Sequence, residues 1–418
     1  MKPPVSQTRS EDPLVIWLSG EPWDQPGGSH RDMATAMSEH ARILWVDPPS
    51  SLVSRGRAHG TLTPTLTQLT ARITRLNPVV LPAFTRVGVR ATTPFLVRAQ
   101  VRWALRIMRS RPSAAVMLYL GGLLGGWGTD VTNVMYGTDN YVAGARLMGM
   151  SVGYMRRQER QALAHADKVI VVSSELASRW SSMGAKPVVI PNGCWPLAEV
   201  TNPPQSDHLN LSHPVVGLVG RLSDRIDIGV LEAIVEAGQS LLIVGPVDLR
   251  WEPERFRRLV SRPEVHYAGS VPQADVPRYL AMADVGLTPY RDTPFNRASF
   301  PLKTLEYMSA GLPVVVGDLP ESRWLRRDLE ETLPLDQADQ VLVLAADRQD
   351  YVQAIRGLNV GGADAVARRV AFAQRHSWPG RAERFAAEMG LSAVRDPESA
   401  TGKSLANFDE GRHSPRSR

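Results

Sequence analysis

Two residues in the segment from Asn296 to Gly317 have the types and spacing needed to bind a phosphorylated sugar. Lys303 and Glu306 are three residues apart, so on a helix they lie on one face. A helix N-terminus carries partial positive charge and free N–H groups, so the turn before Leu302 can hold an anion. Lys303 adds a full positive charge there, and the Glu306 carboxylate can accept hydrogen bonds from sugar hydroxyls. The pair predicts a site for a phosphate joined to a ribose; a capped helix with a solvated Lys–Glu pair is the alternative.

The same segment contains the elements that must position this pair. Its sequence, NRASFPLKTLEYMSAGLPVVVG, predicts a loop, a short helix and a buried strand in that order. Pro301 suits the first helical position, where its missing N–H would be unpaired and its fixed φ is already helical. Gly311 ends the helix and Pro313 prevents its continuation, while the valines at 314–316 predict a strand buried on both sides.

A second set of candidates follows the first expected strand, Leu14–Leu18. A glycine-containing loop, a helix over about 31–40 and a strand at 43–47 complete a βαβ unit. In open sheets of this kind, ligands bind beyond the carboxyl ends of the strands, which places Gly27 and Gly28 at that position. Their spacing is neither G-x-G-x-x-G nor a P-loop, and a plain turn is the alternative. His30 follows Gly27 by three residues and could assist a reaction at this position. A structural histidine at a helix start is equally compatible with the pattern.

Further along the chain, two more expected strands are followed by polar residues. Asp139 follows an expected strand at 133–135. Its carboxylate is placed to face a ligand, and a helix N-cap is the alternative role. The strand Val215–Val219 is followed by Gly220 and Arg221 and then by a helix over 228–235. Residues 50–70 show no clear pattern, and 114–120 predicts another buried strand.

The segment around Lys303 resembles the signature of nucleotide-sugar-dependent glycosyltransferases of the GT-B fold, specifically the large retaining family 4. The pattern N-x-x-S-x-P-L-K-x-x-E-Y-M-x-x-G-x-P-V-V is similar to a teichuronic-acid-type branch that builds cell-envelope polymers. The resemblance covers about 14–390, weakly in the first half and strongly from Val215 to Gly317. In the family at large, a second Glu lies eight residues before the position of Glu306, and here Ala298 replaces it.

The resemblance implies an α/β fold class with two Rossmann-like, doubly wound domains facing each other across a cleft. We expect residues 1–11 to be disordered, 12–196 to form an acceptor domain and 197–213 a linker. Residues 214–375 would form the nucleotide-sugar-binding domain, 376–391 a helix crossing back to the first domain, and 392–418 a disordered tail.

The resemblance also assigns roles to individual residues. It places Arg221 and Lys303 at the donor diphosphate as catalytic groups, with Asp139 at the acceptor hydroxyl and His30 as an assistant. Arg225 stands near Ile226, where the family has a Lys, and is accepted as the replacement. The expected donor-binding set is Gly27, Gly28, Arg225, Gly269, Val271, Ser299, Leu302 and Glu306. No metal and no cofactor are expected, and the donor would be a UDP-, GDP- or dTDP-sugar.

Composition is consistent with this function and argues against others. With 418 residues, 43% hydrophobic and 22% charged, the chain suits two globular domains, and its single cysteine, Cys194, fits a reducing cytoplasm. The net charge of +6 comes from scattered basic residues without interleaved aromatics, so no nucleic-acid partner is expected. Arg98, Arg102 and Arg106 recur at four-residue steps on an expected helix over 93–109. They predict a peripheral contact with the anionic inner face of the plasma membrane, or else a solvated face.

The leading interpretation is sugar transfer from a nucleotide sugar to a sugar or lipid-linked acceptor, with retention of configuration. Two alternatives remain: a sugar-nucleotide epimerase of the same fold, which needs no acceptor, and a non-catalytic nucleotide-sugar-binding relative, which the absent carboxylate at Ala298 keeps open.

Overall fold

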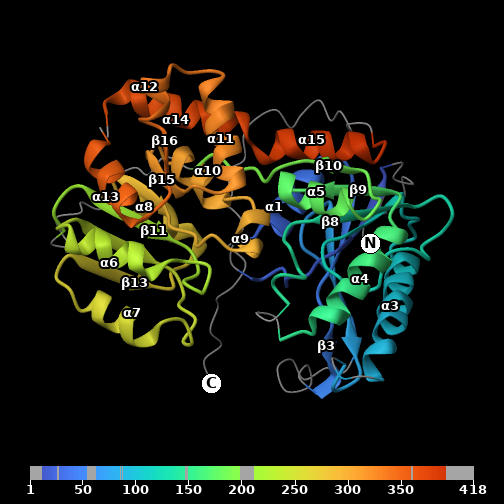
Figure 1. Cartoon of the computed structure of the whole chain (residues 1–418). Helices are drawn as coiled ribbons and strands as arrows, with labels where there is room; N and C mark the ends of the chain where they lie inside the picture. Colours follow the sequence, from blue (N-terminus) through green and yellow to red (C-terminus); the bar gives the residue numbers. More distant parts are fainter. Residues whose placement is uncertain are drawn as a thin grey trace, which may run out of the picture. The chain divides into compact units, whose positions relative to one another are not determined.

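The computed structural model describes residues 12–25, 28–53, 63–84, 86, 88–145, 149–197, 211–358 and 361–391. The chain divides into two compact units. The first consists of Met1–Gly193, Thr293–Phe300 and Trp378–Val394, and the second of Cys194–Asp292, Pro301–Ser377 and Arg395–Arg418. In Figure 1 the colours follow the sequence, so the return of late segments to the first unit can be traced by eye.

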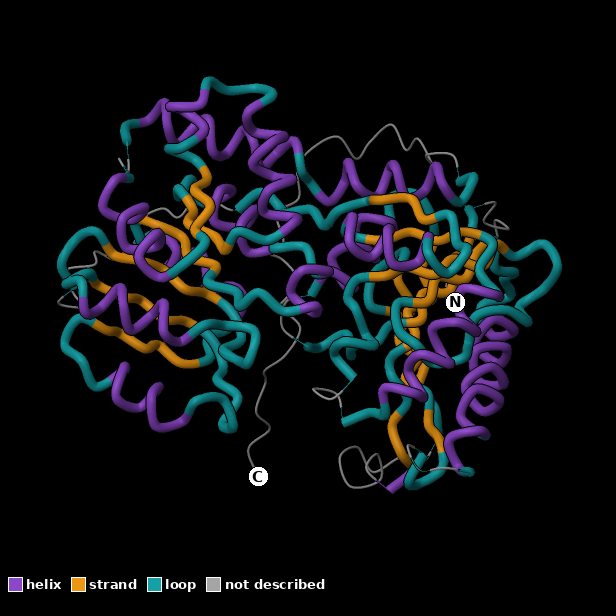
Figure 2. The backbone as a smooth tube through the Cα atoms, viewed as in Figure 1, coloured by secondary structure: helices purple, strands orange, loops and turns teal. Residues whose placement is uncertain are grey.

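The first unit is built on an eight-stranded sheet in the order β10-β9-β8-β7-β1-β2-β5-β4. All neighbours pair in parallel except β4 and β5. Figure 2 draws the strands in orange. The central strand β1 reads LVIWL and is buried along its whole length, as parallel strands covered on both faces are. The strands of this unit are β1 (Leu14–Leu18), β2 (Arg42–Val46), β3 (Ser50–Ser51), β4 (Thr65–Gln68), β5 (Ile73–Asn77), β6 (Val79–Val80), β7 (Ala114–Met117), β8 (Thr132–Gly137), β9 (Lys168–Val171) and β10 (Pro187–Val189).

Helices connect these strands, as a doubly wound topology requires. Helix α1 follows β1, and helix α5 follows β9. Ser173 is the N-cap of α5, and its side chain accepts a hydrogen bond from the Leu176 N–H. The helices are α1 (Ser29–Met37), the 3₁₀ turn η1 (Val89–Ala91), α3 (Thr93–Ile107), α4 (Val152–Ala164), α5 (Ser174–Ser181), α9 (Pro294–Ala298) and α15 (Trp378–Glu388).

Two helices from late in the sequence complete the first unit. Helix α15 packs on α1, and its Phe385 ring lies 5.8 Å from Trp17 and 5.0 Å from Tyr136, centroid to centroid. Helix α9 packs against α5. The expected second domain, 214–375, contains α9, whereas the structure places Thr293–Phe300 in the first unit, because the contacts of this segment are made there.

The second unit is built on a six-stranded parallel sheet in the order β13-β12-β11-β14-β15-β16. Its core is one cluster of buried aliphatic and aromatic residues that includes Val216, Leu231 and Trp251. Ile226, which stands at the family's Lys position, belongs to this core. The strands are β11 (Val215–Val219), β12 (Ser240–Val244), β13 (Val265–Gly269), β14 (Val285–Thr288), β15 (Val314–Gly317) and β16 (Leu342–Ala345).

Polar caps fix where two helices of the second unit begin. Asp227 caps α6 by accepting the Gly229 N–H, and Asp347 and Asp350 form a reciprocal capping box at α13. The helices are α6 (Ile228–Glu236), α7 (Pro253–Val260), the 3₁₀ turn η3 (Gln273–Asp275), α8 (Val276–Leu280), α10 (Leu302–Ser309), α11 (Pro320–Glu330), α12 (Leu335–Ala338), α13 (Arg348–Gly357) and α14 (Ala363–Arg375).

Most expected elements are present with bounds shifted by a few residues. The strands predicted at 14–18 and 215–219 are confirmed as β1 and β11. The prediction that 50–70 is loop-like was wrong in part, because β3 and β4 lie there; β4 is an exposed, polar edge strand that lacks the apolar alternation of a buried one. The expected disordered ends, 1–11 and 392–418, and most of the expected linker, 198–210, lie outside the described residues.

Candidate functional site

In the second unit, Gly220, Gly245 and Gly269 lie close together at the carboxyl ends of β11, β12 and β13. The Gly245 N–H donates to the Gly269 carbonyl at 2.7 Å, and a Cβ on Gly245 would lie 2.0 Å from the Gly220 oxygen. Gly245 therefore tolerates no side chain, and its φ of 135° favours glycine as well. Gly245 was not among the predicted residues; the signal was its place directly after the buried run LLIV. Val271 follows two residues after Gly269 and is half-buried.

Lys303 lies against this glycine turn. Its Cε is 3.9 Å from the position that a Cβ on Gly220 would occupy, so the structure brings Lys303 close to Gly220 and its neighbour Arg221. Arg221 is exposed, and within the described part of the chain its guanidinium forms no hydrogen bond or ion pair. Two predicted cationic residues thus stand at the end of the sheet where a parallel fold binds ligands.

Helix α10 presents Lys303 and Glu306 together, as the spacing predicts. The Lys303 Nζ lies 2.5 Å from Glu306 Oε2, and each side chain is about a quarter exposed. Leu302 is the first residue of the helix, and its N-cap, Pro301, provides no side-chain cap, so the first N–H groups of α10 receive no capping bond from it. The hydroxyl of Tyr307, one residue on, binds the Val219 N–H at 2.7 Å and fixes α10 to the end of β11.

Arg225 is held in a different way. Its guanidinium lies over the ring of Tyr290, 5.0 Å from the centroid, and its carbonyl accepts the Arg291 N–H. Ile226 beside it is 3% exposed and packs into the core, so this position holds no charge. A donor-binding role for Arg225 stays a prediction.

In the first unit, Asp139 and Glu21 lie at the carboxyl ends of β8 and β1. Asp139 follows Thr138 after the end of β8 and is half-buried. Burial raises the pKa of Glu21 to about 7, and repulsion from Asp139 and then from Asp32 adds to the rise. Glu21 was missed from the sequence, although it follows a buried strand within three residues, the same signal that singled out Asp139.

His30 connects these two strand ends. Its Nδ1 lies 3.3 Å from the Ser19 Oγ and its Nε2 lies 3.1 Å from the Thr138 Oγ1. The ring is buried, and burial lowers the pKa of His30 to about 4, so the imidazole is neutral near pH 7. Both ring nitrogens have protein partners, an arrangement typical of a positioning histidine rather than of a proton acceptor for a substrate.

Of the two predicted loop glycines, Gly27 lies outside the described residues and Gly28 is the N-cap of α1. A Cβ on Gly28 would lie 2.6 Å from Glu21 Oε2, so the Glu21 carboxylate lies against the start of α1.

Ser299 and Ala298 are positioned by the first unit. The Ser299 Oγ donates to Asp139 Oδ1 at 2.8 Å, and the carbonyl of Ala298 accepts the Ser173 Oγ at 2.6 Å. Ala298 is 3% exposed, and a carboxylate at this position would be buried without the water that normally solvates it. The structure therefore ties Ser299, predicted to bind the donor, to the residue predicted to bind the acceptor.

The arginine stripe of α3 has internal partners. Arg98 donates to the carbonyl of Gly122 at 3.1 Å, and Arg102 donates to that of Gly126 at 3.0 Å. The exposed face of α3 also carries apolar side chains: Phe95 is 73% exposed, Ile107 55% and Trp103 37%, and Arg102 and Arg106 are exposed with them.

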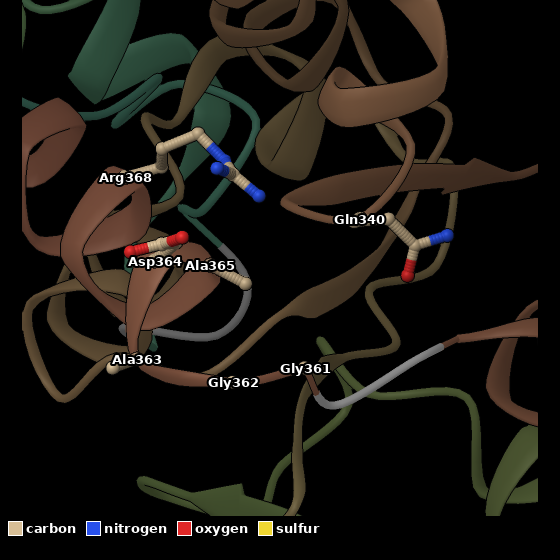
Figure 3. Close-up of a pocket in the computed structure, with 7 residues that line it drawn as sticks. All are labelled: Gln340, Gly361, Gly362, Ala363, Asp364, Ala365 and Arg368. Carbon is tan, nitrogen blue, oxygen red and sulfur yellow. The ribbon is translucent and has the colours of Figure 1, made fainter.

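A pocket of about 330 Å³ lies elsewhere in the second unit (Figure 3). It is lined by Gln340 and by residues at the start of α14, including Asp364 and Arg368, and it contains none of the predicted site residues. Among the described residues, no group of three His, Cys, Asp or Glu side chains is arranged to hold a metal ion. No helix in the described ranges has the length and apolar character needed to cross a membrane.

Comparisons with solved structures identify the fold. The chain superimposes on sucrose-phosphate synthase from Thermosynechococcus elongatus with a TM-score of 0.65 and 18% identity, covering 90% of this chain and 98% of that one. Anabaena HepE, in complex with UDP and glucose, gives a TM-score of 0.59 and 16% identity, covering 91% of this chain and 99% of that one. The E. coli trehalose-6-phosphate structure with bound UDP-2-fluoro glucose gives a TM-score of 0.62 and 11% identity, covering 90% of this chain and 99% of that one. These likenesses confirm the predicted GT-B architecture.

Sequence comparisons cover part of the chain. A Bacillus subtilis (strain 168) protein provisionally named teichuronic acid biosynthesis glycosyltransferase TuaH is 32% identical over 115 residues, 27% of this chain and 29% of that protein. The match thus spans less than a third of the curated relative's length. The model of the family Glycosyl transferases group 1 matches residues 213–359, which include Arg221, Lys303 and Glu306. Residues 213–359 are therefore a glycosyl transferases group 1 domain in a chain of the GT-B fold.

Proposed function

We propose that this protein is a glycosyltransferase that moves a sugar from a nucleoside-diphosphate sugar to a hydroxyl acceptor. The observation that carries the proposal is the meeting of Lys303, the Gly220–Arg221 turn and the start of α10 at the carboxyl ends of the second unit's strands. A group 1 domain with two cations and a helix N-terminus at this place suits a diphosphate.

The reaction breaks the bond between the anomeric carbon and the β-phosphate oxygen and forms a bond from that carbon to the acceptor oxygen. Negative charge then develops on the diphosphate, and the acceptor hydroxyl loses a proton. Arg221, Lys303 and the N-terminus of α10 would stabilise the charge, and the donor phosphate would take the proton. We propose retention of configuration, a UDP-, GDP- or dTDP-sugar as donor and no requirement for a metal.

The residues that we propose for acceptor binding lie in the first unit. Asp139 and Glu21 follow β8 and β1, the two strands that flank β7, and carboxylates accept hydrogen bonds from sugar hydroxyls. We propose that Asp139 binds the reacting hydroxyl and that His30, neutral and hydrogen-bonded at both nitrogens, positions the loops that carry the two carboxylates.

Envelope-polymer synthesis at the cytoplasmic face of the membrane is the role we propose. The B. subtilis relative is named for teichuronic acid biosynthesis, and the outer face of α3 carries three exposed apolar side chains beside Arg106. Such a face suits the interfacial region of an anionic membrane, where aromatic residues insert and each arginine contributes about 1 kcal/mol.

The activity is tested with the purified full chain and a panel of UDP-, GDP- and dTDP-sugars. Saturation-transfer NMR would identify the donor, and product analysis with and without a panel of p-nitrophenyl glycosides would follow turnover. Transfer that requires an acceptor and survives EDTA is expected. Conversion of donor alone into an isomeric nucleotide sugar would indicate the epimerase, and binding without any turnover would indicate the non-catalytic relative.

Membrane contact is tested by sedimentation with vesicles of increasing phosphatidylglycerol content, at low and high salt. We expect the wild type to pellet with anionic vesicles at low salt and Phe95→Ser/Ile107→Ser to pellet less. Leu249→Ser is the matched control, because Leu249 is 85% exposed but lies in the second unit. If the wild type stays in the supernatant under all conditions, the membrane role is wrong.

A further inference from the structure

Ser299 occupies an unusual place for a residue of the sequence motif that contains Lys303. The motif segment Thr293–Phe300 belongs to the first unit, and Ser299, 7% exposed, is the C-cap of α9 there. Its Oγ lies 2.8 Å from Asp139 Oδ1 and 3.1 Å from the Phe295 carbonyl. The partners are separated by 160 residues in sequence, so only folding brings them together.

The Ser299 hydroxyl has one proton to donate and two acceptors within reach. The carboxylate oxygen is both closer and charged, and hydrogen bonds to charged acceptors are about twice as strong as neutral ones. The bond to Asp139 is therefore the dominant one. It restrains a side chain that is itself half-buried and that the proposed function places at the acceptor hydroxyl.

The backbone that carries Ser299 is anchored independently of this bond. The Ser173 Oγ donates to the Ala298 carbonyl, and the Phe295 ring lies where a Cβ on Gly144 would be 2.9 Å away. Thr293 caps α9 by accepting the Asn296 N–H at 3.2 Å. Because the segment is held at these points, the Ser299 hydroxyl is a fixed donor against which the Asp139 carboxylate can be oriented.

We propose that Ser299 is a positioning residue for the acceptor: its hydroxyl holds the Asp139 carboxylate in the orientation that binds the reacting hydroxyl. This inference rests on the proposed function and reassigns Ser299 from donor binding to the acceptor side. It also means that one short stretch of chain serves both substrates, since Lys303 follows Ser299 by four residues.

The first test is structural and needs no substrate. Crystal structures of wild type, Ser299→Ala and Ser173→Ala would be compared at Asp139. We expect a changed or multiple Asp139 rotamer in Ser299→Ala only, because Ser173→Ala loosens the same segment without removing the Asp139 donor. An unchanged Asp139 rotamer in Ser299→Ala would overturn the positioning role.

The second test is kinetic and uses the p-nitrophenyl glycoside that the wild type glycosylates best. For Ser299→Ala we expect kcat/KM for the acceptor to fall about tenfold while the Kd of the nucleotide sugar, measured by calorimetry, stays unchanged. Asp139→Ala/Ser299→Ala should be no slower than Asp139→Ala, because the Ser299 hydroxyl has no side-chain acceptor to orient once Asp139 is replaced by Ala. Ser173→Ala should lower the melting temperature without this kinetic effect.

The outcomes separate the two levels of inference. A weakened donor Kd in Ser299→Ala, with normal acceptor kinetics, would assign Ser299 to the donor and overturn the proposal. Losses of kcat/KM that add up in the double variant would also overturn the proposal. If the wild type glycosylates no acceptor, the proposed function fails, and the Asp139 rotamer still decides whether Ser299 positions that carboxylate.

Discussion

The carboxyl ends of the parallel strands carry opposite chemistry in the two units. In the first unit they bear carboxylates, Glu21 and Asp139, with Asp32 nearby on α1. In the second they bear Arg221 and Lys303 around a turn of closely approaching glycines. Both units have the same doubly wound topology, so the sheet determines where a ligand binds and the loop residues determine which ligand. An acidic end suits sugar hydroxyls, and a basic, glycine-rich end suits a diphosphate.

The two ends also differ in how their charges are stabilised. Lys303 has a carboxylate partner, Glu306, in its own helix and remains about a quarter exposed. Glu21 is instead buried and lies near the carboxylates of Asp139 and Asp32, and both effects favour its protonated form. The basic end is therefore charged before any ligand binds, whereas the acidic end changes protonation near neutral pH.

The largest expected effect comes from removing the cations of the second unit. Lys303→Ala and Arg221→Ala should each lower kcat/KM about 100-fold, the typical loss of one preorganised stabiliser of transition-state charge. Steady-state kinetics with the identified donor would measure it. Lys186→Ala and Arg258→Ala remove equivalent charges from exposed positions that are not among the predicted site residues, and they should be silent. Near-normal turnover of both site variants with folding intact would remove the diphosphate assignment.

A tenfold effect is expected at Glu306, the acidic residue of the basic end. Glu306→Gln should weaken nucleotide binding about tenfold, because a carboxylate accepts stronger hydrogen bonds from ribose hydroxyls than an amide does. Calorimetry with the nucleoside diphosphate would measure the affinity, and thermal unfolding would serve as the control. An unchanged affinity, or a collapse of the melting temperature, would show that the Lys303–Glu306 pair is structural.

The smallest expected effect is a pH dependence that belongs to the first unit. The folded state raises the pKa of Glu21 from 4.5 to about 7, so it binds more protons than the unfolded state between these values. The contribution of Glu21 to the free energy of unfolding is full below about pH 4.5 and is lost as pH rises through 7. Relative to Glu21→Gln, the wild-type melting temperature should therefore fall between pH 4.5 and 8.

His30 acts in the opposite direction and cancels in this comparison. Its folded-state pKa is lowered to about 4, so its contribution is lost as pH falls from 6.5 towards 4, equally in wild type and variant. A constant difference in melting temperature between wild type and Glu21→Gln across the range would show that Glu21 is not desolvated in solution.

Much of the fold could be predicted from the sequence, and so could the local geometry around Lys303. Buried runs such as LVIWL and VVGLV specified β1 and β11, because a strand covered on both faces has to be apolar throughout. The pairing of Lys303 with Glu306 followed from helical periodicity, a local rule that acts over three residues. Gly220 and Arg221 follow such a strand directly, and the family resemblance made Arg221 a candidate for the donor diphosphate.

The tertiary structure decided everything that depends on distant partners. The arginines of α3 formed a regular stripe in the sequence, but Arg98 and Arg102 each bind a carbonyl that lies 24 residues later in the chain. His30 is neutral because the fold buries it, and the pKa of Glu21 rises to about 7 because the fold buries its carboxylate and places Asp139 near it. Ser299 donates a hydrogen bond to Asp139, and the segment that carries Ser299 is held in place because α9 packs on α5, 120 residues earlier in the chain. Periodicity and turn chemistry act between neighbours in sequence, whereas burial and charge repulsion depend on all atoms nearby in space, so the protonation and the partners of these residues became visible only in the folded chain.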